Sequence, residues 1–395
     1  MDAPIHVLQL HCLTDATAQP ARGWCELLGR LAPLGGTRSM RASLALIQRR
    51  RHEIGWLFRD AAAAGIDCHR LPSAGRWDPR LPWRLWRLIR RLRIDVVHAH
   101  DAPSLWLALV VEPFCRFRTV ATAPDLDMPD LKTPDLAIRE SGRRAARRAR
   151  GEKLLPGFDR VVAANRQLAQ QLVELGCRAG RVDVIPQGVD TAVFSRLPDA
   201  DDSNAARAAL DVPLTAHVVG VDLQHATPSE VIHALEALAS IESALGPVYR
   251  VVLEDRLLAE QLATRDLPPE VAQRTRWVAA GEESPASYAA LDAFVHVGHA
   301  ARVPRSLLEA QSMEVPVVAA DCPGTAELIK DGTTGLLVPP CDTEALTRSL
   351  ARLLGDRREA RAFAAAGRLR VRQRFHVGQQ AQQMAETYYR VMSQV

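Results

Sequence analysis

A short run of charged and hydroxyl-bearing residues, from Arg302 to Glu309, could bind a phosphate. Pro304 suits the first turn of a helix that carries Ser306 and Glu309, and the backbone amides of a first helical turn are free to donate to an anion. Arg302 and Arg305 flank this turn, so either guanidinium could add positive charge. The alternative is that both arginines are ordinary surface residues that face solvent.

A second polar group, His98, His100 and Asp101, follows a hydrophobic run. An imidazole titrates near pH ~6.5, so it can exchange protons or hydrogen-bond to a ligand near neutral pH. The alternative is that these side chains are satisfied polar groups within the fold.

The cysteines indicate neither disulfides nor a structural metal. Their number is odd and none lies in a C-x-x-C pair, which favours thiols in a reducing cytoplasm. No other cluster of ligand types argues for a metal or a cofactor, so we expect neither. The seven are Cys12, Cys25, Cys68, Cys115, Cys177, Cys322 and Cys341.

Short apolar runs rich in β-branched residues alternate with longer amphipathic stretches almost throughout. This alternation predicts parallel strands covered by helices on both faces, and two successive series of runs predict two doubly wound α/β domains. The polar stretch Pro198–Asn204 between the series is typical of a linker. Ligands of such sheets bind beyond the carboxyl ends of the strands. The expected strands are Ile5–Leu10, Ser43–Ile47, Ile94–His98, Thr119–Thr122, Arg160–Ala164, Val182–Ile185, His217–Val221, Tyr249–Leu253, Arg276–Ala279, Ala293–Val297, Pro316–Ala319 and Gly335–Val338.

The composition excludes several classes of protein. With 395 residues, 47% hydrophobic and 24% charged, the chain is long enough for two domains and too apolar for disorder. Leu105–Val111 is among the longest apolar stretches, far short of the roughly 20 residues of a membrane span. The start, Met1-Asp2-Ala3-Pro4, lacks the basic residues of a secretory signal, so we expect a cytoplasmic protein. The net charge of +4 combines a basic first half with an acidic second half, which suggests different partners for the halves.

Several motifs in the last third of the chain resemble, in their order, the nucleotide-sugar-binding domain of family 4 glycosyltransferases (glycosyl transferases group 1). The first half agrees through Asp95–Asp101, Phe158–Val162 and Val184–Asp190. The resemblance implies the GT-B fold, in which two Rossmann-like domains face each other across a cleft and a C-terminal helix crosses back to the first. The motifs are Tyr288–Val295, Val303–Ala310, Val315–Asp321, Gly324–Glu327 and Gly332–Asp342.

Four family positions are replaced in this chain. The family places an Arg and a Lys after the first strand of the C-terminal domain, two donor-binding glutamates with seven residues between them, and a His near the transferred sugar. Of these, only the second glutamate is present, as Glu309. The replacements are Asp222 for Arg, Thr227 for Lys, Ala301 for the first Glu and Pro124 for His.

The replacements predict weak donor binding. A hydrogen bond to a charged group contributes about 1.5–3 kcal/mol, so the loss of two cations would weaken binding of a diphosphate about 10²- to 10⁴-fold. A carboxylate at Asp222 that faced the diphosphate would add repulsion on the order of 4 kcal/mol at an effective dielectric of about 20. Other cations or hydrogen-bond donors that compensate for the lost ones would have to come from residues near the expected helix that carries Ser306 and Glu309. The donor-side candidates are Glu309, Arg305, Ser306, Arg302 and Leu307, and the acceptor-side candidates are His98, His100 and Asp101.

Two basic segments of the first half could contact an anionic membrane. Trp83–Arg93 places Leu85, Leu88, Ile89 and Leu92 on one helical face and is rich in arginine. Arg139–Lys153 is similarly rich in arginine. The alternative is that both are solvated outer faces of helices that cover a sheet. Nucleic-acid binding is not expected, because the basic runs lack stacking aromatics beyond two tryptophans.

The sequence as a whole leads to three hypotheses. The first is an enzyme of the cytoplasm, which could also lie at the inner membrane face as a peripheral protein. The resemblance implies that it transfers a sugar from a nucleotide sugar, with retention, to a glycan, lipid-linked or small-molecule acceptor. The second hypothesis is a catalytically lapsed member, a pseudoenzyme, that acts as a binding or partner subunit. The third is a transferase with a rearranged site built on Arg302, Arg305 and Glu309. The predicted domains are 1–198, 205–375 and a crossover helix at 376–395 that packs on the first domain.

Overall fold

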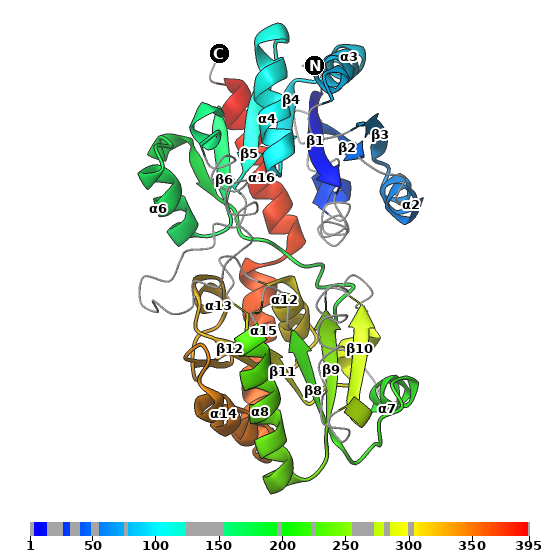
Figure 1. Cartoon of the computed structure of the whole chain (residues 1–395), viewed down its shortest axis with the longest axis vertical. Helices are drawn as coiled ribbons and strands as arrows, with labels where there is room; N and C mark the ends of the chain where they lie inside the picture. Colours follow the sequence, from blue (N-terminus) through cyan, green and yellow to red (C-terminus); the bar gives the residue numbers. More distant parts are fainter. Residues whose placement is uncertain are drawn as a thin grey trace. The chain divides into compact units, whose positions relative to one another are not determined.

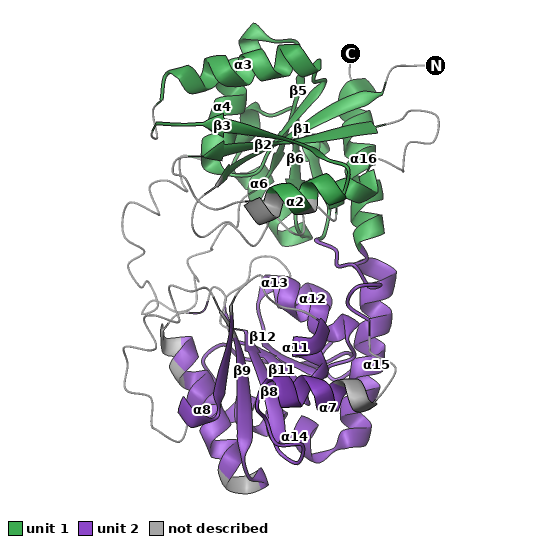
Figure 2. Cartoon of the chain, turned by 90° about the vertical axis from the view of Figure 1, so that its right-hand side faces the viewer, with its two compact units in different colours: residues 1–186, 377–395 green, residues 187–376 purple. Residues whose placement is uncertain are grey.

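The computed structural model describes residues 4–13, 27–31, 40–48, 55–74, 78–123, 153–195, 200–222, 226, 228–254, 272–279, 285–298 and 304–393. The chain divides into two compact units, which Figure 2 colours separately. Unit 1 comprises residues 1–186 and 377–395, and unit 2 comprises residues 187–376. Each unit contains one parallel sheet, in agreement with the predicted class. The predicted domain boundaries, 1–198, 205–375 and 376–395, stay a prediction.

Unit 1 is built on a parallel sheet of seven strands in the order β3-β2-β1-β4-β5-β6-β7 (Figure 1). Its strands are β1 (Ile5–Leu13), β2 (Met40–Gln48), β3 (Asp67–Pro72), β4 (Val96–Ala99), β5 (Arg118–Thr122), β6 (Arg160–Ala163) and β7 (Val182–Val184). Its helices include α2 (Gly55–Ala63), α3 (Arg80–Leu92), α4 (Ala102–Val111), α6 (Arg166–Glu174) and α16 (Val377–Ser393), with single turns η3 (Glu112–Phe114), η4 (Leu155–Gly157) and η5 (Ala179–Arg181).

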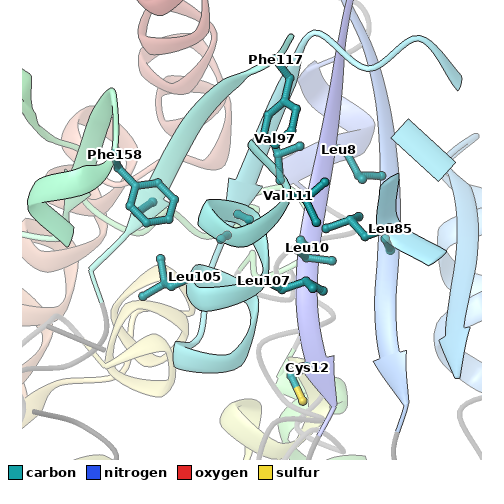
Figure 3. Packing of buried hydrophobic residues seen from close by; sticks show 14 of the residues in the cluster. Leu8, Leu10, Cys12, Leu85, Val97, Leu105, Leu107, Val111, Phe117 and Phe158 are labelled. Atoms are coloured by element: carbon teal, nitrogen blue, oxygen red, sulfur yellow. The ribbon is translucent and has the colours of Figure 1, made fainter. Parts of the chain in front are cut away.

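The two faces of this sheet are covered by different helices because side chains alternate along each strand. Leu8 and Leu10 of β1 lie in one buried cluster with Leu85 of α3 and Val111 of α4, as Figure 3 shows. Val7 lies on the opposite face, in the cluster that α16 completes. Burial of apolar surface on both faces therefore fixes the sheet between α3, α4 and α6 on one side and α16 on the other.

A buried carboxylate attaches α16 to the sheet. Asp183 of β7 accepts two hydrogen bonds from the guanidinium of Arg160, at 2.6 and 2.7 Å, in a bidentate pair. The same carboxylate accepts from Thr387 at 3.0 Å and from Arg390 at 2.6 Å, both of which lie on α16. Four donors to one carboxylate compensate the cost of burying its charge.

Unit 2 is built on a parallel sheet of six strands in the order β10-β9-β8-β11-β12-β13. Its strands are β8 (His217–Asp222), β9 (Val248–Glu254), β10 (Thr275–Ala279), β11 (Ala293–His296), β12 (Val317–Ala320) and β13 (Leu336–Val338). Its helices include α7 (Ala200–Ala209), α8 (Pro228–Leu245), α11 (Pro285–Ala289), α12 (Arg305–Ser312), α13 (Pro323–Leu328), α14 (Thr343–Gly355) and α15 (Arg357–Arg374).

Close packing against α11 and α12 explains a glycine in the central strand of unit 2. Phe294 of β11 shares a buried cluster with Leu307 of α12 and Tyr288 of α11. A Cβ at Gly220 would lie only 2.7 Å from the Phe294 ring and 2.6 Å from Leu291. Gly220 therefore lets the aromatic ring pack directly on β8, on the same face as Asp222 two residues later.

The structure confirms the twelve predicted strands. It adds one strand that was not predicted and corrects part of the predicted linker. β3 was not predicted, because this edge strand has the sequence DCHRLP and only Leu71 within it is buried. The predicted linker Pro198–Asn204 is wrong from Ala200 onward, where α7 begins. The alanine-rich segment that follows favours helix, and Ser203 and Arg207 hydrogen-bond to the rest of unit 2.

Candidate functional site

Three residues singled out from the sequence, His98, His100 and Asp222, lie at strand ends that border the point where the strand order of each sheet reverses. In unit 1 this point is between β1 and β4, and in unit 2 it is between β8 and β11. Open α/β sheets bind ligands beyond the carboxyl ends of the strands at these points. His98 and His100 occur at the end of β4, and Asp222 ends β8.

In unit 1, polar side chains form a layer at the carboxyl ends of β1, β4 and β5, on the face of the sheet that α16 covers. Along β1, the apolar Val7 is followed on the same face by Gln9 and then His11. Val96 of β4 is followed in the same way by His98, which is the register partner of Gln9. Apolar side chains therefore give way to amide and imidazole groups at the carboxyl edge of the sheet.

Tyr388 of α16 joins this layer to the C-terminal helix. Its hydroxyl accepts from the amide of Gln9 at 2.8 Å and lies 2.7 Å from Nδ1 of His98. The other ring nitrogen of His98 lies 2.8 Å from the Thr122 hydroxyl, and Nε2 of His100 lies 2.7 Å from Oε1 of Gln9. His98 therefore has hydrogen-bond partners within the fold, as the alternative interpretation proposed.

Three imidazoles of this layer lie against one another. The rings of His11 and His100 are stacked with centroids 4.1 Å apart and an interplanar angle of 3°, and His98 lies 4.1 Å from His100. Burial, together with a smaller contribution from the neighbouring His11, lowers the pKa of His98 to about 3. Burial alone lowers the pKa of His11 to about 3. Both rings are therefore neutral hydrogen-bonding groups at neutral pH.

We expect unit 1 to lose stability as the pH falls below about 6.5. The unfolded chain takes up protons on these imidazoles at its ordinary pKa, whereas the folded chain resists protonation down to a pH of about 3. Each such imidazole reduces the free energy of unfolding by about 1.4 kcal/mol per pH unit within this window. Urea melts of the full chain at several pH values should show this slope, and His98→Gln should reduce it by about one imidazole's share. An unchanged slope would contradict the buried neutral state of His98.

Asp101, a predicted acceptor-side residue, has a structural role in unit 1. It is the N-cap of α4, where Oδ1 accepts from the backbone amide of Ser104 at 2.9 Å. Its Oδ2 accepts from the backbone amide of Cys12 at 2.6 Å. The carboxylate thus fixes the start of α4 against the end of β1, which positions the adjacent His100. An additional contact between Asp101 and an acceptor stays a prediction.

In unit 2, Asp222 is held inside the protein. Its Oδ2 accepts from the hydroxyl of Ser306, in the first turn of α12, and lies 3.0 Å from Nδ1 of His296. Asp222 and His296 are register partners on β8 and β11, and both are fully buried. Asp222 was expected to face and repel a diphosphate. Its side chain is instead hydrogen-bonded within this buried cluster. Repulsion of a diphosphate by Asp222 stays a prediction.

Glu309, the remaining glutamate of the family pair, forms a second cluster one turn further along α12. Its Oε2 accepts from the Tyr288 hydroxyl at 2.8 Å, and its Oε1 accepts from Nε of Arg305 at 2.7 Å. The Arg305 side chain is 22% exposed and that of Glu309 is 5% exposed. Both carboxylate oxygens of Glu309 are therefore occupied, and the charge of Arg305 is already matched by a carboxylate.

The other predicted donor-side residues are only partly described. The side chain of Leu307 is fully buried in the apolar cluster of α11 and α12, so only its backbone could reach a ligand. Arg302, Thr227, Ala301 and Pro124 lie outside the described residues. The roles assigned to these positions stay predictions.

Arginines near the loop after β8 in the sequence are used elsewhere in unit 2. No Lys or Arg occurs between Arg207 and Arg250. Arg207 pairs with Asp292, just before β11, at 2.9 Å, and the fully buried Arg250 pairs with Glu242 of α8 at 2.9 Å. Neither arginine therefore supplies charge at the carboxyl end of β8.

Sequence reasoning missed several residues that take part in these clusters, among them Thr122 of β5 and Tyr288 of α11. Gln9, His11 and Tyr388 contribute to the layer in unit 1, and His296 contributes to the cluster in unit 2. Polar residues at alternate positions after an apolar strand start would have indicated Gln9, His11 and His296. Tyr388 could not be found in this way, because α16 follows the rest of unit 1 by almost two hundred residues.

Two family profiles match this chain in consecutive regions. The profile described as Glycosyltransferase Family 4 matches residues 37–193. The profile described as Glycosyl transferases group 1 matches residues 226–370. Together the two regions cover most of the chain. The first region contains most strands of the unit 1 sheet, and the second contains most strands of the unit 2 sheet. The chain belongs to the family 4 glycosyltransferases. Its two parallel-sheet units are those of the GT-B fold.

Curated relatives of this family member include three proteins named D-inositol 3-phosphate glycosyltransferase. That of Nocardia farcinica is 29% identical over 67% of this chain and 59% of its own length. That of Thermobispora bispora is 28% identical over 77% of this chain and 72% of its own length. That of Salinispora arenicola is 30% identical over 66% of this chain and 61% of its own length. The chain thus covers less than two thirds of the length of two of these relatives.

Solved structures of similar fold include a glycosyltransferase from Rickettsia africae, with a TM-score of 0.78 and 18% identity. It covers 99% of this chain and 100% of its own. Anabaena HepE in complex with UDP-glucose has a TM-score of 0.78 and 20% identity, and covers 98% of this chain and 100% of its own. At these identities the likeness shows the fold alone.

Two further properties concern only the part of the chain that the structure describes. Within that part, no group of three or more His, Cys, Asp or Glu residues is arranged to hold a metal ion. Within the same residues, no helix combines the length and the apolar character needed to cross a membrane.

Proposed function

We propose that this family member binds a glycan or lipid-linked acceptor, or a partner protein, without transferring sugar from a nucleotide donor as the family does. One observation carries the proposal. At the reversal point of the unit 2 sheet, where the family motif has an arginine, Asp222 is buried and hydrogen-bonded to Ser306 and His296. This position offers a diphosphate neither a cation nor a free donor.

The chemistry of sugar transfer explains why the missing cation matters. The diphosphate leaving group gains negative charge as the glycosidic bond breaks, and positive groups nearby stabilise that charge. Loss of two cationic partners removes about 3–6 kcal/mol of this interaction. Arg305 is a weak substitute because its guanidinium is already paired with Glu309. Binding of the donor and stabilisation of its leaving group are both expected to fall.

The layer in unit 1 supports a retained binding role. The imidazoles of His11 and His98 and the amide of Gln9 are neutral hydrogen-bonding groups, a chemistry that suits the hydroxyl groups of a glycan. The residue at its edge, His100, is half-buried and therefore near the surface of unit 1. The pairing of Tyr388 with both Gln9 and His98 keeps this layer in a single arrangement. We assign acceptor binding to it by analogy with the family.

A retaining transferase with a rearranged donor site is the second candidate. The observation that favours it is the Arg305–Glu309 pair in α12, since a diphosphate at the start of that helix could take over the guanidinium from Glu309. Arg305→Ala distinguishes the two candidates. If the rearranged site exists, this variant would abolish the binding of UDP-glucose. Under our proposal, neither the wild-type chain nor the variant binds UDP-glucose.

We expect Thr227→Lys to raise the affinity of the chain for UDP-glucose. The substitution restores one family cation and leaves Asp222, Ser306 and His296 unchanged. One charge-assisted hydrogen bond of about 1.5–3 kcal/mol predicts a gain of roughly 10- to 100-fold. Calorimetric titration of this variant against a Thr227→Gln control measures the gain. Equal affinities of the two variants would show that charge at this position does not limit donor binding.

A further inference from the structure

The hydrogen bonds of the unit 1 layer form a continuous series, which we name the polar chain. Thr122 of β5 lies 2.8 Å from Nε2 of His98, whose Nδ1 lies 2.7 Å from the Tyr388 hydroxyl. That hydroxyl accepts from the amide of Gln9 at 2.8 Å, and Oε1 of Gln9 lies 2.7 Å from Nε2 of His100. His98 and Tyr388 are fully buried, whereas His100 is half-buried. The polar chain therefore ends on a side chain near the surface of unit 1.

The chemistry of these groups gives the polar chain one direction. A carbonyl oxygen only accepts, so the contact with Oε1 of Gln9 requires a proton on Nε2 of His100. Because the Tyr388 hydroxyl already accepts from Gln9, it donates its own proton to Nδ1 of His98. Burial raises the pKa of Tyr388 above its ordinary value, which keeps that proton on the phenol. The neutral His98 then carries its proton on Nε2 and donates it to Thr122.

The resulting tautomer of His100 determines what its ring can bind. In a neutral imidazole with its proton on Nε2, Nδ1 carries a lone pair and accepts hydrogen bonds. A hydroxyl group can donate to this atom. A fully ionised phosphate or a carboxylate cannot, because its oxygens carry no proton. The polar chain thus makes His100 an acceptor for a ligand hydroxyl.

The charges near the polar chain disfavour an anion in the same way. The partners described above for its imidazoles are a hydroxyl, a phenol and an amide, all of them uncharged. The carboxylate of Asp101 lies beside the layer, because it follows His100 in the sequence and accepts from the backbone amide of Cys12 at 2.6 Å. A negative charge at this position repels a phosphate that approaches His100. The lone pair and the carboxylate together favour an uncharged ligand that carries hydroxyl groups.

We propose that Tyr388 is a positioning residue that sets the tautomer of His100, and that the unit 1 layer thereby selects uncharged sugar hydroxyl groups over phosphate groups. The inference rests on the acceptor-binding role proposed above and names the chemical class of that acceptor. It does not depend on whether unit 2 binds a donor. Tyr388 acts through Gln9, since its own side chain is fully buried.

Nitrogen NMR of the full chain with isotope-labelled histidine tests the positioning step. In the wild-type chain we expect Nδ1 of His98 and of His100 to resonate as unprotonated nitrogens, and Nε2 of both rings as protonated ones. Tyr388→Phe should give a mixture of tautomers at both rings. The reason is that Gln9 loses the acceptor that fixes its amide, and His98 loses the donor to its Nδ1.

A change in tautomer can be separated from a change in fold. Tyr388→Phe should leave α16 in place, because Asp183 still accepts from Thr387 and Arg390 of that helix. The matched control is Tyr389→Phe, which removes the neighbouring hydroxyl of the same helix and should leave both tautomers as in the wild type. Unchanged tautomers in Tyr388→Phe, or a wild-type chain with its protons on Nδ1 of both rings, would overturn the positioning role.

Saturation-transfer NMR with matched probes tests the selectivity. The probes are glucose, mannose and galactose, each compared with its phosphate ester. We expect a neutral sugar to bind about 10-fold or more tightly than its ester at low salt. Tyr388→Phe should weaken the neutral sugar about 3- to 10-fold, and Tyr389→Phe should not. Binding of the esters as tight as that of the sugars, or of no sugar in the panel, would overturn the selectivity.

Titration of the same samples with UDP-glucose keeps this inference distinct from the proposed function. Saturable binding of UDP-glucose together with a preference for neutral sugars would contradict the proposed function and support the selectivity of unit 1. A preference for the phosphate esters without binding of UDP-glucose would overturn the selectivity and leave the loss of donor chemistry in place.

Discussion

We expect Asp222→Ala to lower the free energy of unfolding of unit 2 by about 3–5 kcal/mol, the usual effect of removing one partner from a buried polar pair. The only hydrogen-bond partner of His296 among the described residues is Asp222. Truncation leaves this fully buried imidazole and the Ser306 hydroxyl without an acceptor. It also releases the first turn of α12 from the end of β8.

Two further variants separate the hydrogen bonds from the charge of Asp222. Asp222→Asn keeps an acceptor oxygen, so it should cost less than the alanine variant. An apolar combination, Asp222→Leu with Ser306→Ala and His296→Phe, removes all three polar groups and should recover part of the loss. Denaturant melts of the full chain measure these differences. A loss below about 1 kcal/mol for Asp222→Ala would contradict a buried cluster that holds α12 in place.

The sequence was sufficient to predict the parallel sheets because their strands are short apolar runs. The runs that form β4, β6, β11 and β12 are buried along their whole length, so hydrophobicity alone distinguishes them from the helices that cover them. β3 escaped prediction because an edge strand needs little apolar surface. The start of α7 escaped prediction because its polar residues are typical of linkers as well as of helix starts.

The site was harder to predict because its contacts join distant parts of the chain. His98 and Asp222 could be singled out by position, but not their partners. Tyr388 reaches His98 across 290 residues, and Ser306 reaches Asp222 across 84 residues. The sequence identified the residue types at the strand ends. It did not predict that the side chain of Asp222 is buried, because that orientation depends on the hydroxyl and imidazole groups around it.

The largest functional effect that we expect is weak donor binding by the wild-type chain. Without the two family cations, affinity for a nucleotide sugar should be about 10²- to 10⁴-fold below that of a member that has them. This factor reflects only the missing attraction of the two cations, and repulsion of a diphosphate by Asp222 would increase it. The expected loss exceeds the change that we predict for Thr227→Lys, because that variant restores only one of the two cations.

Calorimetric titration of the purified full chain with UDP-glucose, GDP-mannose and the free diphosphates is the most direct test. We predict no saturable binding, or dissociation constants weaker than about 1 mM, under conditions where the chain is folded. Micromolar binding that survives Arg305→Ala and Arg302→Ala would contradict the account, because the chain would then hold a diphosphate without any of the cations considered for this site.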